Sequence, residues 1–304
     1  MFRKGQNYRI FIGANCVAEE TTCTVTRSVD AQNAVNKDLA SDSTQNGLIG
    51  QNPVPMYKNM QFQVEAQGEG AISLHTSCRE LMNADGGMIA WAPTDGLMNR
   101  AVESTPTYYY AICNDLVLNT PNRQPNTCTA QFIVIGVVPS ESAPTPATPS
   151  GTPSTNILRG EFIRLFLGSS TAPVACCTNT TVHISLSMED ATTKDTDSQT
   201  GFGYKVQEPT MLNYDISTDC LYGGGVVDLV EGSTTAWELC RASGTGQQTK
   251  GTPIIGGTAI VTSIAANAPV GQNITYNASF TGIGLPTQMR STSNNPNQGT
   301  TGEE

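Results

Sequence analysis

Two stretches of the chain share one pattern of apolar and polar positions and many of the same residues. Residues 119–136 read NTPNRQPNTCTAQFIVIG, and residues 267–284 read NAPVGQNITYNASFTGIG. Eight of these eighteen positions are identical, where ordinary composition gives about one. In each stretch apolar and polar side chains alternate, which predicts a strand buried on one face. We therefore expect an internal duplication with a shift of 148 residues.

The repeat continues through the rest of the chain. Residues 8–13 (YRIFIG) match residues 163–168 (IRLFLG), and both read as a short strand stopped by a glycine. Residues 182–188, 60–64 and 212–216 alternate apolar and polar side chains, as strands with one buried face do. Further strands are predicted to close the copies at 88–91, 108–118 and 130–138, and at 237–241, 259–266 and 278–285.

Helical signals are few. The segment SCRELM (77–82) has the spacing of a capping box, which predicts a short helix beginning there. In the second copy, residues 226–230 (VVDLV) occupy the equivalent place. Each copy also contains a polar, glycine-bearing segment, at 39–55 and at 196–209. Long connections without structure of their own are often functional.

The repeat and the local composition divide the chain into four parts. Residues 1–139 and 161–286 form the two copies, each long enough for its own core. Residues 140–160 are rich in Pro, Ser and Thr, which is typical of an extended linker. The polar residues 287–304 hold too few apolar side chains for a core, so we expect a disordered tail.

The overall composition narrows the class of protein. Charged residues make up 14% of the chain, well below the usual quarter, and turn-forming residues replace them, which favours an all-β fold. The net charge of −10 argues against a protein that grips nucleic acid, because phosphates recruit Lys and Arg. We find neither a signal peptide nor an apolar run of membrane-spanning length, so we expect a soluble product made inside a cell.

Residues that carry chemistry are sparse and scattered. The nine cysteines contain no CxxC pair and are interpreted as buried, reduced thiols rather than a metal site. Of the two histidines, His183 aligns with Thr26 of the first copy, and His75 has no counterpart. Nothing in the sequence places a nucleophile beside either one. We therefore expect no enzyme, no cofactor and no metal.

A series of short motifs in the second copy resembles the major tail tube proteins of long-tailed bacteriophages. The likeness covers residues 162–286 and, through the internal repeat, residues 8–139 more weakly. Each motif alone is unspecific, and it is their order and spacing that carry the resemblance. The motifs are RLFLG (164–168), ATTKDTDSQTGFG (191–203), NYDIS (213–217), GGTAIVTSI (256–264), NAP (267–269) and NITYNASFTGIG (273–284).

The resemblance implies a β-sandwich or barrel domain flanked by a short α-helix. Six such domains form a ring, and rings stack into a tube through which viral DNA passes without specific binding. Family members usually carry one domain per chain, so a duplicated chain implies a trimer with pseudo-sixfold symmetry. Contacts between rings are implied for the loops after the two Lys-Asp pairs, which gives the candidate assembly residues Lys37, Asp38, Asp42, Lys194, Asp195 and Asp197.

The same resemblance implies partners and a location. The chain would contact copies of itself and other tail proteins (tape measure, tail tip and terminator) in the virion tail, after synthesis in the host cytoplasm. Two alternatives stay open. One is a tail-tip, tube-initiator or terminator protein on the same fold. The other is a β-sandwich surface-binding or adhesin module, which the Ser/Thr/Pro linker and three N-x-[ST] sequons favour.

Overall fold

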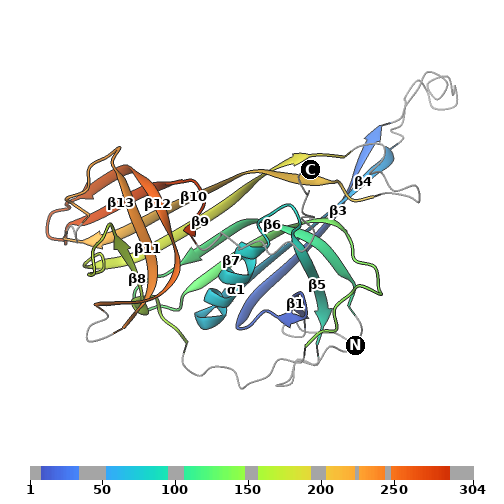
Figure 1. The fold of residues 1–304 in the computed structure, drawn as a ribbon, viewed down its shortest axis with the longest axis horizontal. Coiled ribbons are helices and arrows are strands. Elements are labelled where there is room, and N and C mark those ends of the chain that lie inside the picture. The colour runs from blue at the N-terminus through green and yellow to red at the C-terminus, as the bar shows by residue number, and fades with distance from the viewer. Residues whose placement is uncertain are drawn as a thin grey trace, which may run out of the picture. The chain divides into compact units, whose positions relative to one another are not determined.

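The computed structural model describes residues 8–33, 53–94, 106–147, 157–192, 203–222, 226–243 and 248–287. Within these ranges the protein is mostly β-strand, and the prediction of an all-β fold with few helices is confirmed (Figure 1). No helix in the described ranges has the length and apolar content that a bilayer crossing requires. The helical elements there are α1 (Gly68–Glu80) and the 3-10 turn η4 (Gly160–Phe162).

The strands of the first copy form an antiparallel arrangement in the order β1-β5-β6-β7-β4-β3. A two-residue strand, β2, adds to the outer edge of β1. The bounds are β1 (Tyr8–Ile12), β2 (Asn15–Cys16), β3 (Glu20–Asn33), β4 (Pro53–Gln67), β5 (Gly87–Pro93), β6 (Tyr108–Asn119) and β7 (Thr127–Val137).

The second copy repeats this order. Strands β8, β11, β12 and β13 follow one another as β1, β5, β6 and β7 do, the end of β10 lies next to β13, and β9 neighbours β10 as β3 neighbours β4. The bounds are β8 (Ile163–Leu167), β9 (Cys177–Asp190), β10 (Gln207–Leu221), β11 (Thr234–Ser243), β12 (Thr249–Asn267) and β13 (Thr275–Ile283).

The two closing hairpins agree residue by residue. Cys113 faces Phe132 across β6 and β7, and Val261 faces Phe280 across β12 and β13, both shifted by 148. The same irregularity follows each pair, between Cys113 and residue 115 and between Val261 and residue 263. Phe132 and Phe280 are both buried. The sequence echo therefore reflects equivalent structure, down to the position of a bulge.

The start of each copy is equivalent as well. Strands β1 and β8 both end before a glycine with positive φ, Gly13 at 57° and Gly168 at 61°. Each glycine donates its N–H over 2.7 Å to a carbonyl of the neighbouring strand, Met88 O for Gly13 and Ala236 O for Gly168. Because Met88 and Ala236 are also 148 residues apart, the predicted glycine stops are confirmed together with their partners.

Alternation of apolar side chains places one face of each hairpin in a core. In the first copy, α1 covers that face and packs on β4, β6 and β7 with Leu74 and Cys78 buried (Figure 1). In the second copy the core is built by large side chains of β11, β12 and β13. They are Trp237, Leu239, Ile255, Val261 and Phe280.

Contacts divide the chain into two compact units. Unit 1 holds residues 1–161 with 178–217, and unit 2 holds residues 162–177 with 218–304. The division therefore cuts β9 near its start and β10 near its end, because most of both strands belongs with the first unit. The predicted copies, 1–139 and 161–286, are units of sequence repetition, and as domain limits they stay a prediction.

The helix prediction was wrong in position and in number. The helix α1 ends at Glu80, close to where the capping-box pattern placed its start. In place of a side-chain cap, its first turn uses distant partners: Gly70 N–H donates to the Glu19 carboxylate over 3.0 Å, and Gly68 N–H donates to Asn126 O over 2.9 Å. Residues 226–230, expected as a second helix, form turns.

Strands also reach further into the predicted polar segments than expected. The strand β4 already begins at Pro53, within the predicted loop 39–55, and β10 begins at Gln207, within 196–209. At its start, β4 pairs only with β3 among the described strands, so its other edge is open there. Prolines are tolerated on such an edge because they lack an N–H to pair.

Candidate assembly surface

The two sequence copies meet at a strand junction. The second half of β6, residues 115–119, pairs antiparallel with residues 181–185 of β9. The first half of β6 uses the same edge to pair with β5. The strand β6 therefore passes from a neighbour of its own copy to a neighbour from the second copy, and both segments of the junction belong to unit 1.

One face of the junction is apolar and fully buried. Leu116 lies opposite Ile184, and Leu118 lies opposite Val182. All four side chains have an exposed fraction of 0%. Burying one such side chain contributes ~1.5–3 kcal/mol. The junction is thus held by core packing as well as by backbone hydrogen bonds.

The other face carries polar pairs. The Thr181 hydroxyl donates to Asn119 Oδ1 over 3.1 Å. Nε2 of His183 lies 2.8 Å from Asp115 Oδ2 and donates to it. Because these side chains are 43% and 34% exposed, the pair is screened by solvent and contributes at most about 1 kcal/mol.

The loop after β6 lengthens the junction. Thr120 N–H donates to Thr180 O over 2.9 Å, and Asn122 N–H donates to Thr178 O over 2.8 Å. Further along, Asn126 N–H donates to Leu158 O over 3.2 Å. The first copy therefore contacts both the start of β9 and the chain that precedes the second copy.

The repeat places counterparts of these two edges elsewhere in the chain, where no other described strand pairs with them. The counterpart of 115–119 is residues 263–267 of β12, which pair only with β13 in the described structure. The counterpart of 181–185 is residues 24–28 of β3, which pair only with β4 within those ranges. Most of these ten side chains are exposed, and only Val25 and Ile264 are partly buried.

The predicted assembly residues Lys37, Asp38, Asp42, Lys194, Asp195 and Asp197 all lie outside the described residues. The segments that flank their loops lie inside, within unit 1. There Lys205 Nζ lies 3.2 Å from Asp30 Oδ2 and 4.0 Å from Asp190 Oδ2. Lys58 N–H also donates to Gly203 O over 2.9 Å. The structure thus brings the bases of the two predicted loops together.

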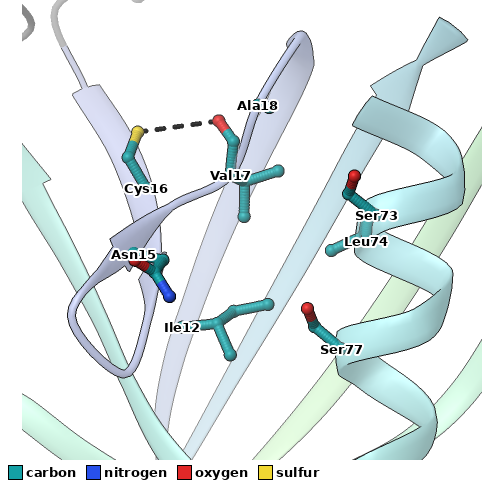
Figure 2. Close-up of a pocket in the computed structure, with 8 residues that line it drawn as sticks. All are labelled: Ile12, Asn15, Cys16, Val17, Ala18, Ser73, Leu74 and Ser77. Atoms are coloured by element: carbon teal, nitrogen blue, oxygen red, sulfur yellow. Dashed lines mark hydrogen bonds between the residues drawn. The ribbon is translucent and has the colours of Figure 1, made fainter. Parts of the chain in front are cut away.

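A cavity of about 230 Å³ opens between the β1–β2 turn and α1. Figure 2 shows the side chains that line it, with Ser73 and Ser77 on the helix and Cys16 on β2. The Cys16 thiol donates to Val17 O over 3.6 Å. Its lining is small polar and apolar, with no histidine or carboxylate among the eight residues.

Several buried thiols lie in surroundings that favour the protonated form. Burial raises the pKa of Cys78 and of Cys128 well above its usual range, and it raises the pKa of Cys240 to about 11. Protonated thiols are weak nucleophiles and weak metal ligands. No disulfide joins any of the nine cysteines, all of which lie in the described ranges. Nor do those ranges contain a cluster of three His, Cys, Asp or Glu side chains placed for a metal ion.

The strand junction was missed by reasoning from the sequence, although a signal was present. The copies differ in apolar content at the four positions that the junction buries. Leu116 and Leu118 have Ile264 and Ala266 as counterparts, and β9 residues 182 and 184 have Val25 and Arg27. A scan against protein-family models and a search of curated proteins both found no match to this chain.

Proposed function

We propose that this chain is a structural protein that assembles head to tail into closed rings, and that stacked rings form the tail tube of a long-tailed bacteriophage. The observation that carries the proposal is the strand junction between β6 and β9. Its two edges recur, without a strand partner in the described residues, on β12 and β3. A contact that joins unlike edges is a head-to-tail contact, which closes into a ring or continues as a filament.

Free strand edges support assembly over a monomeric role. An exposed edge offers unpaired N–H and C=O groups to any other strand, and monomeric proteins block such edges with charges, prolines or covering segments. Residues 263–267 carry no charge and no proline. Residues 24–28 carry one charge, on Arg27. Edges of this composition suit regular pairing with a copy of the same chain.

The ring size follows from the duplication together with the resemblance to tail tube proteins. A ring of six domains needs three chains when each chain supplies two adjacent segments. The proposed particle is therefore a trimer with pseudo-sixfold symmetry. Successive rings stack through the loops that carry Lys37, Asp38, Asp42, Lys194, Asp195 and Asp197.

The charge of the chain suits a channel for DNA. A net charge of −10 gives a field that repels phosphates, so DNA passes without being held. The proposed partners are further copies of the chain and the tape measure, tail tip and terminator proteins. The role needs no catalytic residue and no cofactor.

Electron microscopy of the purified protein, alone and with tail-assembly partners, tests the proposal. We expect rings or tubes with threefold symmetry, and a persistent monomer that binds a glycan would overturn the tube function. A second test exchanges charges in one loop, Lys194→Glu with Asp195→Lys. We expect the exchange to shorten or abolish tubes while rings and the thermal midpoint of the chain persist. Tubes of unchanged length would contradict the stacking role.

A further inference from the structure

We infer that residues 263–267 of β12 pair with residues 24–28 of β3 from a second copy of the chain, in the register of the internal β6–β9 junction. The inference rests on the proposed head-to-tail assembly and names the contact that produces it. The register follows from the two sequence shifts, 148 for β6 to β12 and 157 for β3 to β9. It places Ser263 opposite Ser28, Ala265 opposite Thr26, and Asn267 opposite Thr24.

The polar face of this pairing repeats the internal one. The internal junction is marked by a hydrogen bond from the Thr181 hydroxyl to Asn119 Oδ1. The counterparts of these residues are Thr24 and Asn267, which are identical to them and exposed. The pair is thus available for the same hydrogen bond between chains. The His183 and Asp115 positions become Thr26 and Ser263, so the ion pair is confined to the internal junction.

The apolar face of the proposed pairing has a similar total side-chain volume, but the large side chain lies on the other strand of the hairpin. Leu118 lies opposite Cys128 in its own hairpin, whereas Ala266 lies opposite Tyr276. The volume lost on β12 is therefore regained on β13. Ile264 would face Arg27, whose aliphatic stem covers apolar surface while its guanidinium stays in water.

The loop after β12 lacks the strand contacts that its counterpart, the loop after β6, makes in the described structure. Thr120 and Asn122 donate their N–H groups to β9, and Thr120 is buried. Their counterparts are Ala268 and Val270, and Val270 is fully exposed. A second copy would bring residues 21–23 of β3 alongside this loop. Those residues would accept the backbone hydrogen bonds that β9 accepts in the internal junction, and they would shield Val270.

The variant Ala266→Lys separates this pairing from folding. Ala266 is exposed in the single chain, but its counterpart Leu118 is 0% exposed in the internal junction. A lysine there meets solvent in the monomer and a desolvated strand edge in the assembly. We expect the population of rings to fall about tenfold or more with little change in the melting of the monomer. The matched control is Ala236→Lys, an exposed alanine on β11, both of whose edges are already paired.

The direction of the contact gives a second expectation. An Ala266→Lys chain keeps an intact β3 edge, so it joins one wild-type neighbour and then stops growth. An equal amount of this variant should therefore reduce ring formation by wild-type chains, and Ala236→Lys should not. Rings that form normally from Ala266→Lys alone would overturn the pairing.

Crosslinking tests the register. Monomers carrying Ala265→Cys are mixed with monomers carrying Thr26→Cys and treated with a short thiol-reactive crosslinker. We expect a covalent dimer whose joined peptides contain positions 265 and 26, identified by mass spectrometry, and none in either variant alone or in wild type. Replacing Thr26→Cys by Val25→Cys, on the other face of β3, should remove the product. Rings without the 265–26 crosslink overturn this inference but leave the proposed function standing, whereas a chain that never assembles overturns both.

Discussion

A buried histidine makes the first unit of the protein sensitive to acid. His75 lies on α1 with an exposed fraction of 0%. Neither of its ring nitrogens has a hydrogen-bond partner within the described residues. Burial, together with the neighbouring Arg79 charge, lowers the pKa of His75 to about 3. The imidazole is therefore neutral in the folded chain at every pH where the protein is handled.

The size of the effect follows from proton linkage. The unfolded chain binds a proton at His75 with a pKa of about 6.5, whereas the folded chain does not until about pH 3. Between these values the unfolded state holds one proton more, so the free energy of unfolding falls as the pH falls. Each pH unit changes it by about 1.4 kcal/mol. Going from about pH 6.5 to about pH 5 therefore costs roughly 2 kcal/mol of stability.

The assay compares wild type with His75→Leu. Urea unfolding of the monomer is measured at about pH 7 and about pH 5. Leucine cannot bind a proton, so we expect the acid-induced loss of stability to be roughly 2 kcal/mol smaller in the variant. All other ionisable groups are shared by both proteins and cancel in the comparison. An equal loss in both proteins would refute the assignment of His75 as a buried neutral base.

Two further pairs of variants test the fold. Phe132→Ala and Phe280→Ala remove equivalent buried rings, so each should lower the free energy of unfolding by about 3–5 kcal/mol, and a negligible loss in either one would argue against equivalent cores. Gly86→Ala should cost at least about 1–2 kcal/mol from its positive φ, and more because the new Cβ would lie 2.4 Å from Ala111 O. Gly13→Ala has a similar φ but meets open space, so calorimetry should show the smaller loss for it.

The strands and their duplication could be predicted from the sequence because both signals are local. Alternation of apolar and polar residues marks a half-buried strand wherever that strand lies in the chain. The identical residues Phe132 and Phe280 allow the two hairpins to be aligned in sequence, and the strand registers of these hairpins agree in the structure. Residue spacing within a hairpin is preserved by duplication, so sequence alignment and structural register carry the same information there.

The helix could not be placed because its start depends on a distant residue. The first turn of α1 is satisfied by Glu19, 51 residues before Gly70, and by Asn126, 58 residues after Gly68. A capping pattern describes only neighbouring residues, and SCRELM (77–82) has that pattern without its function. The turn at 226–230 replaced an expected helix because β-branched valines and the nearby Gly232 have low helix propensity.

The pairing of β6 with β9 could not be predicted from the sequence. The sequence indicates that β6 and β9 are strands, but not which edges meet, since many pairings of two strands are compatible with their patterns. The uneven apolar content of the copies becomes informative only once the pairing is known. Leu118 is then recognised as a buried junction residue, whereas Ala266, its counterpart in the repeat, lies on an exposed strand edge.

The number of chains in one ring decides whether each chain supplies two adjacent segments. Native mass spectrometry of isolated rings measures that number without any assumption about symmetry. We expect a ring of about 97 kDa, three times the 32.2 kDa of one chain. A ring built from six whole chains, twice that mass, would contradict it.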